Sequence, residues 1–70
     1  MDRKLEVGKN IAALIKCSGE SQAQIAREIG ITAATLSEYI KGKAYPSMAV
    51  FLKLCQKLDC TYDDILGRLD

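Results

Sequence analysis

The sequence predicts an all-α fold, a compact domain of five short helices that spans residues 1–70. Three observations indicate this fold class. Apolar residues recur at the three- and four-residue steps of a helix, and no strand-like alternation persists. Residues that cap or end helices separate these apolar stripes at short intervals. Apolar residues make up 49% of the chain, which is enough for one core near the lower size limit of a stable domain.

The first helix is expected to carry a single apolar stripe between recognisable ends. Asp2 can cap its N-terminus, and Gly19 is expected to end it. The residues of the stripe that should face the core are Val7, Ile11, Leu14 and Ile15.

Two further helices are predicted on either side of a short turn, residues 30–32. Ser21 should cap the second helix, with Gln24 in the capping-box position, and Thr32 should cap the third. Gly30 supplies the left-handed exit from the second helix. Helices joined by so short a turn cross steeply, and Ala26 is the small residue that a close crossing requires. The inward face of the third helix is expected to hold Leu36, Tyr39 and Ile40. These features predict a helix-turn-helix at about residues 21–41.

The fourth helix follows a loop, residues 42–47. Gly42 should stop the third helix, Pro46 prevents its continuation, and Ser47 can cap the fourth. The buried face of the fourth helix is expected to hold Met48, Phe51, Cys55 and Leu58, with Leu54 beside them. Asp59 occupies the left-handed exit where glycine is usual.

The fifth helix is predicted from a second capping-box pattern, Thr61 to Asp64, which leads into Ile65 and Leu66. Val50, Leu52 and Leu69 lie off the expected apolar stripes. These spare apolar residues could complete the core or form a patch for a second copy.

Charge is distributed unevenly, although the formal net charge is only +1. Residues 1–57 hold nine Lys and Arg against five Asp and Glu, whereas residues 58–70 hold one Arg against four Asp. A phosphate-binding face is therefore expected away from the C-terminal end. The same charges are also compatible with an ordinary solvated surface.

Several classes of protein are disfavoured by composition. The longest apolar runs, IAALI and MAVFL, are too short to span a membrane, and the first ten residues lack a signal-peptide stretch, which indicates a cytosolic protein. Cys17, Cys55 and Cys60 are expected to be thiols that pack like small hydrophobic residues. No metal, cofactor or small-molecule ligand is predicted, because the chain has no histidine, no C-x-x-C pair and no phosphate-binding Gly loop. An enzyme is for the same reason the least favoured class.

The segments SQAQIAREIGITAATLSEYIKGKAYPS and FLKLCQKLDCTYDDIL resemble the phage-repressor, Cro and xenobiotic-response-element type of helix-turn-helix domain. The resemblance covers about residues 7–66. It implies a lambda-repressor-like five-helix domain that places its third helix in the major groove of double-stranded DNA, commonly as a homodimer on a palindromic site. It also implies a repressor-like transcriptional regulator of bacterial or phage origin. Antitoxins and restriction-modification controllers share this fold, and the sequence does not separate them.

The resemblance also implies which residues face DNA. It assigns a phosphate contact to Gln22, base-facing or adjacent backbone positions to Thr32, Ala33, Ala34, Ser37 and Glu38, and phosphate-facing positions to Lys41, Lys43 and Ser47. The helical period independently places Ala34, Ser37, Glu38 and Lys41 on the outer strip of the third helix, flanked by Ala33 and Thr35. Thr35 and the Tyr45 hydroxyl complete the set expected to face phosphates.

These side chains suit recognition of bases, but each has a simpler interpretation. Alanine can pack on a thymine methyl group, Ser37 can bond to several base edges, and Glu38 can accept from cytosine N4. Alternatively, the alanines are good helix formers on a solvated face, Glu38 pairs with Lys41 three residues on, and the loop lysines serve solubility. An adaptor that binds proteins on the same bundle, with weak or no base reading, is the alternative function.

The chain departs from the family pattern in two ways, which involve three positions. Family members often place a buried Arg–Glu pair where this chain has Ile15 and Ile40. Packed apolar residues can replace a buried ion pair without loss of stability, so Ile15 and Ile40 are predicted to touch. Glu20 occupies a position that is often apolar, which leaves the packing before the second helix open.

Overall fold

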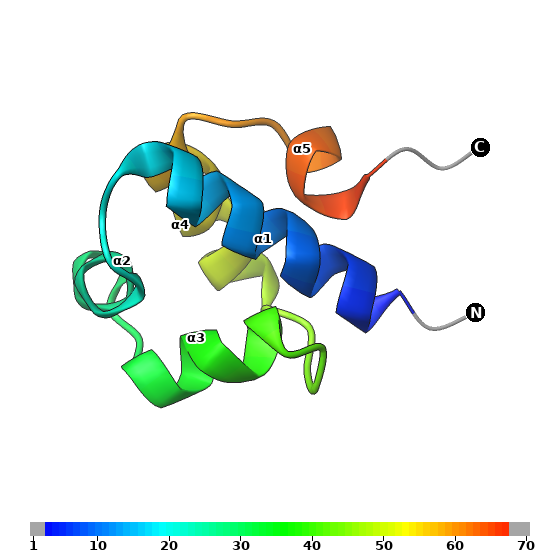
Figure 1. The fold of residues 1–70 in the computed structure, drawn as a ribbon, viewed down its shortest axis with the longest axis horizontal. Coiled ribbons are helices and arrows are strands. Elements are labelled where there is room, and N and C mark those ends of the chain that lie inside the picture. The colour runs from blue at the N-terminus through cyan, green and yellow to red at the C-terminus, as the bar shows by residue number, and fades with distance from the viewer. Residues whose placement is uncertain (1–2, 68–70) are drawn as a thin grey trace.

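The computed structural model describes residues 3–67, in which every regular element is a helix (Figure 1). The helices are α1 (Lys4–Ser18), α2 (Gln22–Ile29), α3 (Ala33–Ile40), α4 (Met48–Leu58) and α5 (Tyr62–Leu66). α1 crosses the middle of the molecule, with α3 along one edge and α5 near the opposite edge (Figure 1). The predicted all-α fold of five helices is confirmed.

The core lies between the helices and receives side chains from all five of them. Its buried members are Val7, Ile11, Ile15, Ile25, Ala26, Ile29, Leu36, Tyr39, Leu54 and Ile65. No charged side chain is buried among the described residues. Ile40 packs at the edge of the same core that contains Ile15, so both isoleucines that replace the ion pair are accommodated by apolar packing. Direct contact between the two side chains stays a prediction.

The predicted helix ends are largely confirmed. The hydroxyl oxygens of Ser21, Thr32, Ser47 and Thr61 each accept the backbone N–H three residues on. The capping box is complete at Thr61, where the Asp64 carboxylate also accepts from the Thr61 backbone N–H. It is only half formed at Ser21, because the Gln24 amide donates to the Glu20 carboxylate instead. Asp2 lies outside the described residues, and the N-cap position of α1 is Arg3, which makes no side-chain cap.

The left-handed residues predicted at the C-terminal ends of α1, α2 and α4 are also confirmed. Gly19 and Gly30 adopt the left-handed conformation at the ends of α1 and α2, with φ of 79° and 83°. Asp59 does so at the end of α4, with φ of 52°, and is the only described non-glycine residue with positive φ. A carboxylate side chain tolerates this conformation better than most others do.

The inward face of α4 differs from the predicted one. Leu54 is fully buried, whereas Met48 is 71% exposed, so the placement of Met48 on the buried face was wrong. At about 100° per residue, Val50, Phe51 and Leu58 lie within about 60° of Leu54, and Met48 lies about 120° away. The face is therefore centred on Leu54, and Val50 packs against the core. Leu52 is 42% exposed, and Leu69 lies outside the described residues.

The three cysteines are free, but they do not all pack alike. Cys55 and Cys60 pack at the edge of the core, and the Cys60 backbone N–H donates to the Cys55 carbonyl at 3.0 Å. Cys17 is exposed, so its expected packing as a small hydrophobic residue was wrong. Burial, with smaller contributions from Cys55 and from Asp64 and Asp59, raises the pKa of the Cys60 thiol to about 11.

We expect Cys60 to be alkylated by iodoacetamide far more slowly than Cys17 in the folded chain. A pKa of about 11 instead of 9.0 lowers the thiolate fraction near neutral pH by about 100-fold, and the thiolate is the reacting form. Because the unfolded chain ionises this thiol at its ordinary pKa, the free energy of unfolding should fall as the pH rises from about 9 to about 11. Mass spectrometry of peptides after timed labelling checks the order, and equal rates for Cys17 and Cys60 would contradict it.

None of the helices in the described part of the chain is long and apolar enough to cross a membrane.

Candidate nucleic-acid interface

The turn between α2 and α3 fixes the angle at which α3 leaves the core. Gly30 adopts φ of 83°, and the Ile31 backbone N–H donates to the Ala26 carbonyl at 2.9 Å, which closes the end of α2. Ala26 is buried at 1% exposure, as expected for the small residue at the crossing. The Thr32 hydroxyl then accepts from the Thr35 backbone N–H at 3.0 Å, and α3 begins. The predicted helix-turn-helix is therefore formed by Gln22–Ile29, the turn and Ala33–Ile40.

The C-terminal end of α3 rests directly on the backbone of α1. Gly8 is buried, and a Cβ atom added there would lie 2.3 Å from the Ile40 carbonyl oxygen and 2.5 Å from that of Tyr39. Only a residue without a side chain allows this approach. Sequence reasoning missed Gly8, although an isolated glycine inside a helical pattern is a signal for such close packing. Gly8 therefore positions α3 without lying on its exposed face.

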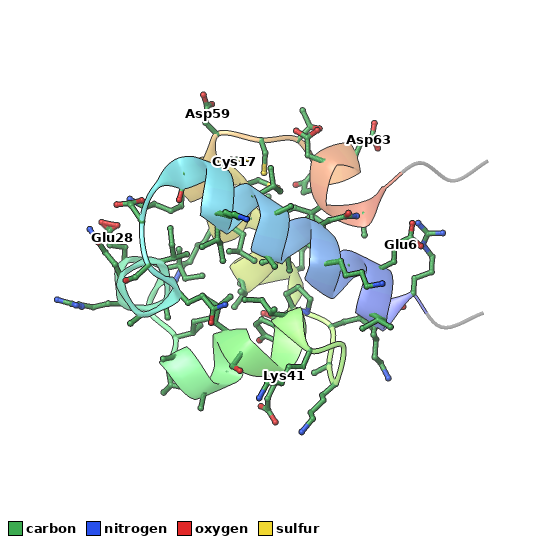
Figure 2. All side chains as sticks on the ribbon, viewed as in Figure 1. Glu6, Cys17, Glu28, Lys41, Asp59 and Asp63 are labelled. Atoms are coloured by element: carbon green, nitrogen blue, oxygen red, sulfur yellow. The ribbon has the colours of Figure 1, made fainter. Side chains whose placement is uncertain are left out.

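The loop after α3 is held against α1 in a similar way. Gly42 has φ of 78°, and a Cβ atom there would lie 2.8 Å from the Leu5 Cα. The Lys43 backbone N–H donates to the Glu38 carbonyl at 2.9 Å. These contacts fix the backbone on both sides of Gly42, so the exposed side chains of Lys41 and Lys43 extend from an ordered base. Figure 2 shows Lys41 on the side of α3 that faces away from α1.

The exposed face of α3 consists of small or polar side chains. Thr32, Ala33, Ala34 and Glu38 are exposed, whereas Thr35 and Ser37 are half-buried. The two threonine hydroxyls lie 2.8 Å apart and share one hydrogen bond. One of their two protons is used within the pair, so one O–H remains able to donate outward. The alanines leave the first turn of α3 narrow, which allows close approach of another surface.

Glu38 also lies on the exposed face of α3, where it was expected either to face bases or to pair with Lys41. No ion pair joins Glu38 to Lys41 within residues 3–67. Its carboxylate can therefore accept hydrogen bonds from outside the chain, and it repels phosphate groups that approach the centre of α3.

A cluster of charges that the sequence did not reveal joins α2 to α4. Lys57 of α4 pairs with Glu20, two residues before α2, at 3.0 Å, and with Glu28, near the C-terminal end of α2. The two carboxylates, Glu28 first, accept hydrogen bonds from the ammonium group and raise the pKa of Lys57. The sequence did not predict how the polar Glu20 would pack before the second helix. In the structure its carboxylate binds both Lys57 and Gln24. Gln22 is exposed as the first residue of the helix.

Tyr45 and Ser47 lie in the loop, and both hydroxyl oxygens already accept hydrogen bonds. The Arg3 backbone N–H donates to the Tyr45 hydroxyl at 3.0 Å, and the Lys4 ammonium lies 5.7 Å from the centre of the tyrosine ring. The Val50 backbone N–H donates to the Ser47 hydroxyl at 3.3 Å. Each hydroxyl keeps its own proton for donation to an acceptor outside the chain.

The lysines assigned to DNA and the aspartates of the C-terminal part lie at different edges of the molecule. Figure 2 shows Lys41 along the edge formed by α3, whereas Asp59 and Asp63 lie at the opposite edge. The residues that sequence reasoning assigned to DNA come from α2, α3 and the loop after α3, at or next to that first edge (Figure 1). Among the described residues there is no group of three or more side chains suited to hold a metal ion.

A helix-turn-helix family matches residues 11–65, most of the chain. The chain belongs to the Cro and phage-repressor type of helix-turn-helix family. Its members are DNA-binding regulators, and the resemblance drawn from the sequence is confirmed. The match includes α2, α3 and the loop that carry every residue assigned to DNA.

Two relatives show how far the similarity of this helix-turn-helix protein extends. It is 38% identical over 62 residues to the antitoxin PezA of Streptococcus pneumoniae, which is 89% of this chain and 39% of PezA. It is 30% identical over 64 residues to the cryptic phage CTXphi transcriptional repressor RstR of Vibrio cholerae, which is 91% of this chain and 57% of RstR. The chain thus spans less than two thirds of either relative. No solved structure gives a significant match.

Proposed function

We propose that this helix-turn-helix protein binds double-stranded DNA sequence-specifically as a repressor-like transcriptional regulator, with α3 in the major groove. The observation that carries the proposal is the exposed face of α3, with its small first turn, between the N-terminus of α2 and the Lys41–Lys43 loop. A major groove about 12 Å wide admits an α-helix. Membership of the family and the similarity to the repressor RstR support the same role.

Phosphate contacts are expected on both sides of α3. At the N-terminus of α2, the backbone N–H groups of the first turn and the helix dipole favour an anion, and Gln22 adds an amide donor there. Lys41 and Lys43 supply charge from the loop, while Thr35, Tyr45 and Ser47 supply hydroxyl donors. Such contacts set affinity and register without selecting sequence.

Base selection is expected from the exposed face of α3. Ala33 and Ala34 offer methyl groups to thymine. The one outward donor of the hydroxyl pair would contact a base when Thr32 carries it and a phosphate when Thr35 carries it. Ser37 can bond to several base edges, and the Glu38 carboxylate, which makes no ion pair within residues 3–67, can accept from cytosine N4.

Two copies on a palindromic site would strengthen binding. One chain offers few phosphate contacts, and half-sites one helical turn apart lie about 34 Å from each other. The described part of the chain measures 32 × 22 × 21 Å, so neighbouring copies fit neighbouring half-sites. We therefore include a homodimer in the proposal.

Lys43→Ala and Ser37→Ala should affect DNA binding in different ways. Lys43→Ala removes a phosphate contact, so it should weaken binding to all duplexes and reduce the salt slope by about one ion per copy. Ser37→Ala should change the preference among sequences selected from a random pool, with little effect on that slope. Fluorescence anisotropy across a salt series measures both, and Lys9→Ala, on the side of α1 away from the core, is the control with the same loss of charge. A flat salt response with no binding at low salt would sink the proposal.

A second candidate is an antitoxin-type protein-interaction module on the same fold, with weak or no base reading. The similarity to the antitoxin PezA and the alanines at the start of α3 favour it. The same salt series separates the two candidates, because a module without DNA contacts gives no salt-dependent binding.

A further inference from the structure

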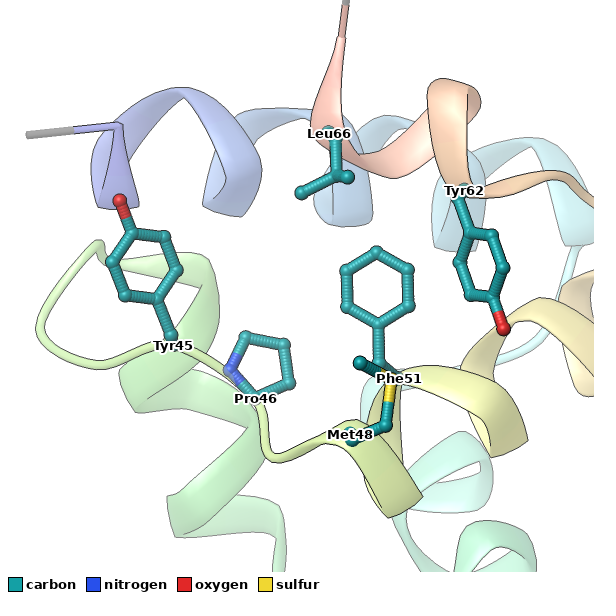
Figure 3. Close-up of a pocket in the computed structure, with 6 residues that line it drawn as sticks. All are labelled: Tyr45, Pro46, Met48, Phe51, Tyr62 and Leu66. Atoms are coloured by element: carbon teal, nitrogen blue, oxygen red, sulfur yellow. The ribbon is translucent and has the colours of Figure 1, made fainter.

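Two features of the described residues lie outside the helix face assigned to bases. One is an open apolar groove of about 500 Å³ between α4, α5 and the loop after α3 (Figure 3). The residues that line this groove are Tyr45, Pro46, Met48, Phe51, Tyr62 and Leu66. Nothing in the described part of the chain indicates what covers it. The other feature, a pair of cysteines at the end of α4, carries a proposal.

Cys55 and Cys60 lie on either side of the residue that ends α4. Cys55 belongs to the last turn of this helix, and Cys60 directly follows Asp59. Both thiols are free and half-buried, and both side chains pack at the edge of the core. Figure 2 shows Asp59 at the edge opposite α3, so the pair lies away from the surface assigned to DNA. The function proposed above uses neither thiol.

The chain folds back at the end of α4 and brings the two cysteines together. Asp59 adopts the left-handed conformation, with φ of 52°, and the Cys60 backbone N–H donates to the Cys55 carbonyl at 3.0 Å. This hydrogen bond is the six-to-one bond of a Schellman motif, in which a contact between the two joined side chains is frequent. The Cys55 and Cys60 thiols are accordingly hydrogen-bonded to each other.

The separation of the two backbones suits a disulfide bond. Given standard bond lengths, the hydrogen bond from Cys60 to Cys55 keeps their Cα atoms at most about 7 Å apart. Cysteines with Cα atoms further apart than about 7 Å cannot be bridged without movement of the backbone. The fold therefore holds this pair within the range that a disulfide can span.

We propose that Cys55 and Cys60 form an oxidation site, at which a low-molecular-weight disulfide converts the two thiols into one intramolecular disulfide. In the first step, a protein thiolate attacks the reagent, whose S–S bond breaks; a mixed disulfide forms and one reagent thiolate leaves. In the second step, the other protein thiolate attacks the protein sulfur of the mixed disulfide and releases the second reagent thiolate. The protein loses two electrons and two protons, and the reagent takes up both as two thiols.

The two cysteines should have different roles in this reaction. Burial is the largest cause that raises the pKa of both thiols. The hydrogen bond between them then lowers the pKa of Cys55 and adds to the rise at Cys60. Cys55 therefore supplies thiolate more readily and should attack the reagent first, because the thiolate is the nucleophile. Cys60 should complete the reaction, since it already lies against the Cys55 sulfur and need not meet the reagent.

Oxidised glutathione tests the proposal on the full chain with Cys17→Ser, which leaves the pair as the only thiols. Intact mass spectrometry should show a product that has lost two hydrogen atoms and carries no glutathione. Trypsin cuts after Lys57, between the two cysteines, so residues 54–57 and 58–68 should stay linked until a reductant is added. Cys60→Ser in the same background is the matched control. It should keep one glutathione on Cys55, because no second thiol can displace it.

The oxidised chain should also remain folded and become more stable. A disulfide that closes a short loop restricts the unfolded chain, so the apparent melting temperature should rise by about 5–15 °C over that of the reduced chain. Circular dichroism measures both the helix content and the melting temperature. Asp59→Gly, which keeps the left-handed residue at the end of α4, should form the same disulfide.

The proposal is overturned if glutathione adducts accumulate on the pair without the internal disulfide, or if the pair stays reduced. It is equally overturned if the oxidised chain loses helix or melts below the reduced chain, because the fold would then not hold the two cysteines at a disulfide distance. No measurement involves DNA, so failure of the DNA-binding proposal would leave these results unchanged.

Discussion

Gly8→Ala is expected to lower the free energy of unfolding by about 2–4 kcal/mol, although alanine is the better helix former by about 1 kcal/mol. The reason is the contact between α1 and α3. The added Cβ would lie 2.3 Å from the Ile40 carbonyl oxygen. The nearest atoms are all backbone atoms of Tyr39 and Ile40, so no flexible side chain can move aside. A chain of this length has about 4–10 kcal/mol of stability in total, so the change is large. Urea denaturation measures it directly.

The same substitution should also weaken binding to DNA, because α3 must shift away from α1 to relieve the contact. Lys9→Ala, at the next position of α1 but exposed, is the matched control and should be neutral or slightly stabilising. If the Gly8→Ala variant is as stable as the unchanged chain, α1 and α3 do not approach each other as closely as described.

Leu54→Ala is expected to cost about 2–5 kcal/mol of unfolding free energy. Leu54 is fully buried at the centre of the inward face of α4, and its truncation removes apolar contacts and leaves a cavity in the core. The apparent melting temperature should fall by about 4–8 °C for each kcal/mol lost in a domain of this size. Thermal and urea denaturation, followed by circular dichroism, check both values.

Leu52→Ala provides the comparison on the same helix, two residues away. Leu52 is 42% exposed, so the identical truncation should cost less than about 1 kcal/mol. Met48→Ala should be equally mild, because Met48 is 71% exposed. Similar losses for Leu52→Ala and Leu54→Ala would show that the inward face of α4 is centred elsewhere.

Prediction from sequence worked best where a local signal decides the structure. Ser21, Thr32, Ser47 and Thr61 cap their helices as expected, because a hydroxyl needs only the backbone three residues on to satisfy it. Prediction was poorer where several elements compete. On α4, Met48 fits an apolar stripe by spacing, but the neighbouring helices select the face centred on Leu54.

The candidate site shows the same division. The exposed positions of Ala33, Ala34 and Glu38 follow from helical period once Leu36 faces inward. Two contacts could not be predicted from the helical period. They are the hydrogen bond between Thr32 and Thr35 and the ion pair between Lys57 and Glu20. The first depends on side-chain rotamers, and the second joins residues 37 positions apart that only the folded chain brings together.

The sequence by itself determined the helix count, most of the helix ends, the helix-turn-helix and the family, because each depends on local spacing and on short-range hydrogen bonds. The tertiary structure alone decided three other features: the backbone contact at Gly8 that sets α3 against α1, the charge cluster around Lys57, and the apolar groove beside Met48. Each of these depends on how whole helices pack against one another. Packing distances and exposed surfaces are properties of several elements together, and no single stretch of sequence encodes them.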